Sequence, residues 1–171
     1  MGASPDTDSN GRFLIKCAQP GRNGISVSKE DDYYPDTLFT SFLDSRLTLA
    51  VDVADGQAVR GVEAHLPPQG GRLTVRVIDA GTQKPVADTK ISICRPANLP
   101  NVRDPECRVI SIRTMVYSQL WPALAFRITV SGTGYEDWYY GGDGSREHAG
   151  VLQLDARQDR QLVIALKQKT H

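Results

Sequence analysis

Four aromatic residues and several carboxylates gather in one short stretch, GYEDWYYGGDG. The aromatic residues are Tyr135, Trp138, Tyr139 and Tyr140, and their acidic neighbours are Glu136, Asp137 and Asp143. Planar rings beside polar loop groups stack sugars, and Tyr and Trp anchor protein interfaces because they bury a large area at low entropic cost. Rings at alternating strand positions also serve core and edge packing. The stretch is the candidate ligand site, for a glycan or a protein, with packing as the third interpretation.

Histidines and acidic clusters do not form a recognisable catalytic or metal motif. A zinc peptidase needs a His-x-x-Glu pair and a distant His, whereas His65 is followed by LPP, His148 by AGV, and His171 is the last residue. The acidic segments 29–36 and 141–148 lack the alternating cadence of a calcium loop. No G-x-S-x-G motif is present. We therefore expect no enzyme activity, no metal and no cofactor.

Two of the three cysteines bracket a loop rich in Pro and Asn, CRPANLPNVRDPEC. A bridge between Cys94 and Cys107 is sterically easy in an oxidising compartment, and two reduced thiols are the alternative in a reducing one. Cys17 has no evident partner, and the absence of a CxxC pair leaves zinc without support.

Composition excludes several classes of partner. The chain has 171 residues with 20 basic and 20 acidic side chains, so no net field favours nucleic acid or an anionic membrane. No apolar run approaches the roughly 18 residues of a membrane helix. The start, MGASPDTDSNGR, has neither a basic nor an apolar region of a signal peptide. We expect neither nucleic-acid binding nor membrane insertion.

Apolar residues recur with a period of two, which predicts strands that bury one side. The alternating segments are 47–53, 73–77, 91–93, 128–130, 152–154 and 162–166. Turns rich in Gly, Pro, Asn and Asp separate them, and convincing helical spacing is lacking. The pattern predicts an all-β protein built as a seven-stranded transthyretin- or immunoglobulin-like β-sandwich, preceded by a partial second sandwich.

The chain also contains an internal repeat of about one hundred residues. ISVS at 25–28 matches ITVS at 128–131, an aromatic segment follows each, and each copy then has an expected strand pair, at 51–66 and 152–166. The offset is 103 residues at the first match and falls to 100 at the last. We expect a back half of one sandwich at 1–67, a joint at 68–71 in which Pro stiffens and Gly frees the chain, and a complete sandwich at 72–169.

The motifs resemble the bacterial carboxypeptidase regulatory-like domain, a transthyretin-like sandwich often found in tandem. VIDAGTQKPVADTKISI carries the strand, Asp79, turn, Pro85, Val86 and strand of that family, and TDSNGRF at 7–13 resembles its middle signature. Gln83 stands where the family usually has Gly, so we expect Gly81 to supply the left-handed turn residue. The second copy lacks the middle signature and is expected to hold a loop and a strand between Cys94 and Phe126.

The resemblance implies a non-catalytic accessory module, either a spacer or a protein-recognition unit, in a bacterial extracytoplasmic protein. A carbohydrate-binding module that uses the aromatic group near 135–140 is the alternative. The partner is then another protein domain or chain, or a glycan. The missing front half of the first copy leads us to expect a fragment of a longer protein, located in the periplasm or at the cell surface. Because this chain carries no signal peptide, a cytoplasmic location is the alternative.

Overall fold

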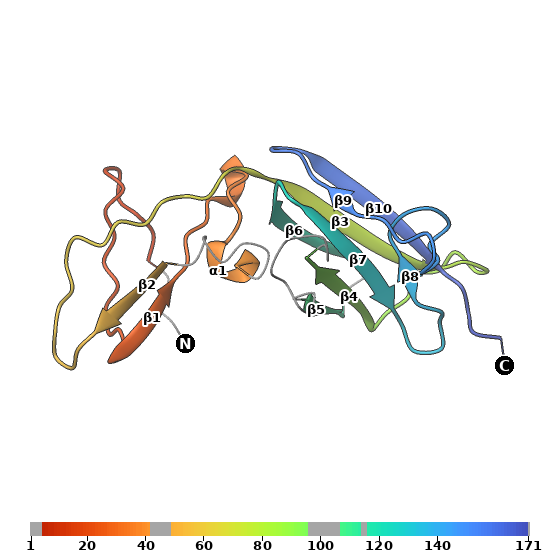
Figure 1. Ribbon diagram of the computed structural model, residues 1–171, viewed down its shortest axis with the longest axis horizontal. Coiled ribbons are helices and arrows are strands. Elements are labelled where there is room, and N and C mark those ends of the chain that lie inside the picture. The colour runs from red at the N-terminus through yellow and green to blue at the C-terminus, as the bar shows by residue number, and fades with distance from the viewer. Residues whose placement is uncertain (1–4, 42–48, 96–106, 114–115, 171) are drawn as a thin grey trace.

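The protein is mostly strand, arranged in several sheets. The computed structural model describes residues 5–41, 49–95, 107–113 and 116–170 (Figure 1). The strands are β1 Gly21–Ile25, β2 Leu49–Val53, β3 Gly70–Asp79, β4 Thr89–Cys94, β5 Cys107–Ile112, β6 Val116–Pro122, β7 Ala125–Ser131, β8 Trp138–Tyr139, β9 Leu152–Gln153 and β10 Asp159–Leu166. A 3-10 helix, η1 Glu30–Asp32, and one short helix, α1 Thr37–Thr40, lie between β1 and β2. Both helices lie beside the larger strand assembly in Figure 1.

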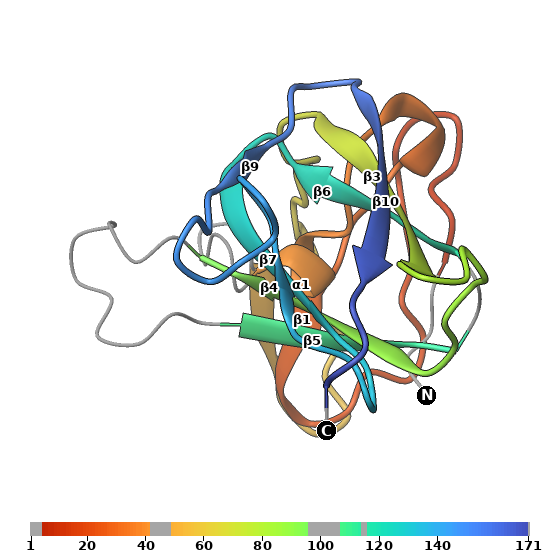
Figure 2. The ribbon, with the colours of Figure 1, turned by 90° about the vertical axis from the view of Figure 1, so that its right-hand side faces the viewer.

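Two sheets pack face to face over one apolar core. The first has the order β10-β3-β6, with β10 parallel to β3 and β6 antiparallel to it. The second has the order β5-β4-β7-β8, and β9 also pairs with β7. The two layers are seen from the end in Figure 2. This arrangement agrees with the expected all-β sandwich. The described residues of this part contain eight strands, so the predicted number of seven and the transthyretin or immunoglobulin type are not confirmed.

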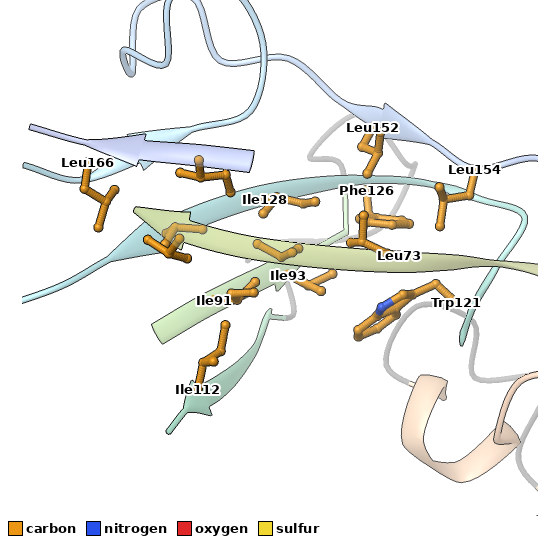
Figure 3. Packing of buried hydrophobic residues seen from close by; sticks show 14 residues of the cluster. Leu73, Ile91, Ile93, Ile112, Trp121, Phe126, Ile128, Leu152, Leu154 and Leu166 are labelled. Atoms are coloured by element: carbon orange, nitrogen blue, oxygen red, sulfur yellow. The ribbon is translucent and has the colours of Figure 1, made fainter. Parts of the chain in front are cut away.

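Alternation of apolar residues builds the core as predicted. Leu73, Val75 and Val77 of β3 are buried at every second position, and they face Ile91 and Ile93 of the opposite sheet. Figure 3 shows Phe126, Leu154 and Trp121 closing the same core at one end. Each fully buried side chain of this size contributes roughly 1.5–3 kcal/mol. One prediction was too simple: two strands, β5 and β6, lie between Cys94 and Phe126 instead of one.

The N-terminal part holds less regular structure than the repeat predicted. The expected strand pair at 51–66 contains only β2, and the rest of that segment forms no strand. Its apolar positions 62, 64 and 66 alternate, but among the described residues no neighbouring strand pairs with them and accepts their backbone hydrogen bonds. β1 ends at Ile25 instead of continuing through 28 and pairs with β2 alone among the described strands.

The remaining strand pair of the first copy matches the second copy in register. Asn23 of β1 lies opposite Val51 of β2, and Phe126 of β7 lies opposite Leu152 of β9. These two pairs are related by offsets of 103 and 101 residues, the same offsets that the sequence repeat shows. Both pairs are antiparallel. The expected repeat and the pairing of these two strand pairs therefore share the same offsets.

The joint between the two parts is structured. Gly70 and Gly71 are buried and begin β3, so the prediction that they free the chain was wrong. A Cβ on Gly70 would lie 1.9 Å from the carbonyl oxygen of Trp121, and only glycine permits that approach. The Gly70 N–H donates to the Tyr33 carbonyl at 2.7 Å, and the Gly70 carbonyl accepts from the Arg157 N–H at the same distance.

A short capped helix places one aromatic ring over the end of the sandwich. Asp36 accepts the Phe39 N–H at 2.8 Å and so caps α1. The Phe39 ring lies 5.5 Å from the Trp121 ring, centroid to centroid, and the guanidinium of Arg108 lies 4.4 Å from the Phe39 centroid. Arg108 also donates to the Phe39 carbonyl. Phe39 therefore extends the aromatic end of the core.

A disulfide joins Cys94 to Cys107, which are directly opposite each other on β4 and β5. The bridge closes the loop between two strands of the same sheet. Cys17 is exposed and unbridged. Residues 96–106 of the bracketed loop lie outside the described part of the chain.

Replacing both bridged cysteines by serine should lower the free energy of unfolding by about 3 kcal/mol, because the unfolded chain gains loop freedom. Urea unfolding followed by circular dichroism measures this change. The Cys17→Ser variant is the matched control and should unfold at the wild-type midpoint. Equal midpoints for all three proteins would contradict a bridged native state.

Candidate functional site

The predicted aromatic group divides into rings with different roles. Trp138 and Tyr140 lie two residues apart around β8, and both pack against the core cluster with an edge-to-face ring distance of 6.4 Å. Tyr139, between them, does not belong to that cluster. All four predicted ring residues are half-buried. The structure brings Trp138 and Tyr140 together at one surface and places Tyr135 in a separate network.

Tyr135 donates a hydrogen bond to the buried carboxylate of Asp79. Its hydroxyl donates to Asp79 Oδ2 at 3.0 Å, and the Gln168 side chain donates to the same oxygen at 2.8 Å. Asp79 Oδ1 accepts the N–H groups of Gly81 and Thr82 at 2.9 and 2.6 Å. Asp79 thus ties the turn after β3 to the segments that follow β7 and β10, and it is only 4% exposed.

These hydrogen bonds change the acidity of both partners. The backbone N–H of Thr82, followed by the Gln168 side chain, holds the pKa of Asp79 well below its usual 3.8 because both stabilise the ionised carboxylate. The hydrogen bond to Asp79 raises the pKa of Tyr135 above its usual 10.0. At neutral pH Asp79 is therefore ionised and Tyr135 keeps its proton, so the network is a structural anchor built on one carboxylate.

The turn that Asp79 organises corrects one expectation. Gln83 adopts a left-handed backbone with φ of 59°, whereas Gly81 does not have a positive φ. Gln83, which stands where the carboxypeptidase regulatory-like family usually has Gly, is therefore the left-handed residue of this turn. The Gln83 side chain donates to the Ala80 carbonyl at 2.9 Å within the same turn.

The segment 141–150 forms a compact loop that covers the edge of Trp138. Its ends are joined by the Gly150 N–H donating to the Tyr140 carbonyl at 2.7 Å, and the Tyr139 N–H donates to the Gly144 carbonyl at 2.8 Å. A Cβ on Gly144 would lie 2.5 Å from the Trp138 Nε1. Gly144 is thus needed to let the loop lie against the indole.

The same loop brings together a Ser, a His and an Asp that match no catalytic sequence motif. His148 Nδ1 lies 3.3 Å from both Ser145 Oγ and Asp143 Oδ1. Hydrogen bonds from the Ser145 side chain and backbone hold the pKa of Asp143 well below its usual 3.8. A hydrolytic triad places the Ser and the Asp on opposite imidazole nitrogens. Here both share one nitrogen, so the cluster braces an exposed loop.

A small pocket lies beside Trp138 and Tyr140. Its volume is about 280 Å³, and its walls are Trp138, Tyr140 and the glycines 141–142 on one side and β10 residues Leu162–Ile164 on the other. This is slightly below the roughly 300–1,000 Å³ of pockets for drug-sized ligands. The pocket has room for one large side chain or one sugar ring.

Two of the three histidines, His65 and His148, lie in the described part of the chain. His65 is exposed, and its Nε2 lies 3.9 Å from a carboxylate oxygen of Glu63. His171 lies outside the described residues. Across residues 5–41, 49–95, 107–113 and 116–170, no group of three or more His, Cys, Asp or Glu side chains is arranged to hold a metal ion. No helix in this described part is long and apolar enough to cross a membrane.

Comparison of the sequence with protein-family models found no match, and comparison with curated proteins found none either.

The Asp79 network predicts a specific pH dependence of stability. Because the folded pKa is lowered, the stabilisation is fully present above the usual value of 3.8 and is lost as the pH falls towards the folded pKa. Urea midpoints measured from about pH 6 to pH 2 should fall steeply below about pH 4 in the wild type and less steeply in Asp79→Asn.

Asp143→Asn is the matched control, since its carboxylate also has a lowered pKa but its side chain is 64% exposed. Solvent screens that site, so its removal should change the pH curve less. An Asp79→Asn curve parallel to that of the wild type would refute the role assigned to Asp79.

Proposed function

We propose that the chain is a non-catalytic accessory module, a spacer or a protein-recognition unit, of a bacterial extracytoplasmic protein, built from carboxypeptidase regulatory-like sandwich units. The observation that carries this proposal is the structured joint around Gly70. A spacer must transmit a fixed geometry between the parts it connects, and a joint with buried glycines and paired backbone groups supports that role.

The turn after β3 supports the family assignment. Asp79 accepts hydrogen bonds from the turn, the Val86 N–H donates to the Val77 carbonyl at 3.0 Å, and Ile78 forms a bridge with Pro85. In these contacts the Asp of the motif binds the backbone of the turn, and the Pro-Val pair aligns the chain after the turn with β3. The left-handed Gln83 supports the same assignment, because glycine is the residue that most readily adopts this backbone.

The joint has side-chain contacts in addition to the backbone bonds. The Tyr33 hydroxyl donates to Asp159 at 3.0 Å, and the guanidinium of Arg72 lies 5.9 Å from the Tyr33 ring centroid. The Gln69 side chain donates to the Asp32 carbonyl at 3.0 Å. Together with Phe39 on Trp121, these contacts span the junction from two sides and favour one relative orientation.

A carbohydrate-binding module is the second candidate, and the pocket beside Trp138 and Tyr140 is the observation in its favour. A glycan array probed with the wild type and Trp138→Ala separates the candidates. Binding to any glycan that disappears in the variant would support a sugar site. A wild-type signal no higher than that of the variant would remove this candidate.

The spacer proposal predicts a single distance between the two parts of the chain. Spin labels at the exposed positions Asp52→Cys and Arg127→Cys, in a Cys17→Ser background, should give one narrow distance distribution by pulsed electron resonance. Phe39→Ala should broaden it, because the ring that contacts Trp121 is lost.

Leu38→Ala is the matched control, since Leu38 lies on the same helix and is 45% exposed. It should leave the distribution narrow. A broad distribution in the wild type would contradict a rigid spacer.

A further inference from the structure

The pocket beside β8 borders the outer edge of β10. Among the described strands, β10 pairs only with β3. The carbonyls of Gln158 and Leu166 accept from Arg72 and Ala80, which directs the backbone groups of even-numbered residues towards β3. Since backbone groups alternate along a strand, those of Gln161, Val163 and Ala165 point to the open side.

Both ends of this open edge are closed by hydrogen bonds. At one end the Arg160 guanidinium donates to the Tyr140 hydroxyl at 3.0 Å. At the other end the Glu136 N–H donates to the Lys167 carbonyl at 2.8 Å, which also confirms that odd-numbered carbonyls point outward. The accessible backbone is therefore limited to residues 161–165. An occupant of this edge must be short and extended.

The chemistry of the pocket favours an apolar group. Leu162 and Ile164 face the two aromatic residues across the pocket. Among the described residues no carboxylate, carboxamide or ammonium group lines it, and the Tyr140 hydroxyl already accepts from Arg160. Sugar sites need several polar side chains to orient hydroxyl groups, whereas an apolar side chain needs only contact area. The backbone N–H and carbonyl of Val163 on the same wall suit another peptide backbone.

The edge lacks the features that normally keep strands apart. Soluble sheets protect their edges with Lys, Pro, bulges or very short strands. The outward side chains between the two closed ends are Gln161, Val163 and Ala165, and Val163 is 64% exposed. β10 is eight residues long and continuous. It is a regular edge that can accept a further strand.

We propose that an extended segment of a partner protein adds a short strand to β10 between Gln161 and Ala165 and inserts one large apolar or aromatic side chain between Trp138 and Leu162. This inference rests on the proposed recognition function and names the site and the partner chemistry for it. Backbone hydrogen bonds supply affinity in such strand addition, and the side-chain pocket supplies specificity.

Selection from a phage-displayed library of random seven-residue peptides tests the proposal, with the full chain as bait. The wild type should enrich peptides with one large apolar or aromatic residue among β-branched neighbours. Val163→Lys should lower phage recovery by about tenfold or more, because Lys protects an edge. Val109→Lys is the matched control, since Val109 is 60% exposed on the edge strand β5, and recovery should stay at the wild-type level.

A selected peptide, synthesised and added to the isotope-labelled protein, should shift the Val163 amide and the Trp138 indole N–H in nuclear magnetic resonance spectra. Equal recovery on Val163→Lys, no enrichment, or shifts elsewhere would overturn the proposal. So would shifts of the Trp138 indole by β-linked glucose or N-acetylglucosamine oligomers without any by peptides. If no peptide binds at β10 but the spin-label distance distribution is narrow, only the strand-addition proposal is wrong. If the distance distribution is broad, the spacer function is wrong.

Discussion

The close approach of Gly70 to the carbonyl of Trp121 is the constraint on which the rest of the molecule depends. It lets β3 begin against the end of β6, and it turns the Gly70 N–H towards the Tyr33 carbonyl of the N-terminal part. A side chain at this position would separate β3 from β6 and withdraw that donor. The Trp121 ring at the same place receives Phe39, so a backbone contact and an aromatic contact hold the junction together.

The alternation of apolar and polar residues predicted much of the sandwich, because a strand that buries one face needs an apolar residue at every second position. The core positions of β3, β4, β7 and β10 follow from alternation alone, since each strand has a neighbour and an opposing sheet. The same pattern failed at 54–66, where none of the described strands pairs with the chain. Glycine at the joint was misinterpreted for a related reason. A glycine permits either freedom or close approach, and only the position of Trp121 decides between them.

The candidate site could be predicted only in part. The sequence brings four rings together, but their roles depend on partners distant in the chain: Asp79 for Tyr135, Arg160 for Tyr140 and Gly144 for Trp138. The pocket itself exists because β10 is the end strand of its sheet, so that its outer edge lies beside Trp138 and Tyr140. The closely spaced Asp143, Ser145 and His148 offered a signal, since three such residues within one loop can meet without any long-range contact.

The central claim is that the N-terminal part and the sandwich form one structural unit through the joint. Native-state hydrogen exchange of the Gly70 amide tests it most directly, because that N–H donates to the Tyr33 carbonyl. We predict that Gly70 is protected to about the same degree as the amides inside β3, so that it exchanges only when the sandwich unfolds. Rapid exchange at Gly70, with the β3 interior still protected, would show that the junction opens independently and would contradict the account.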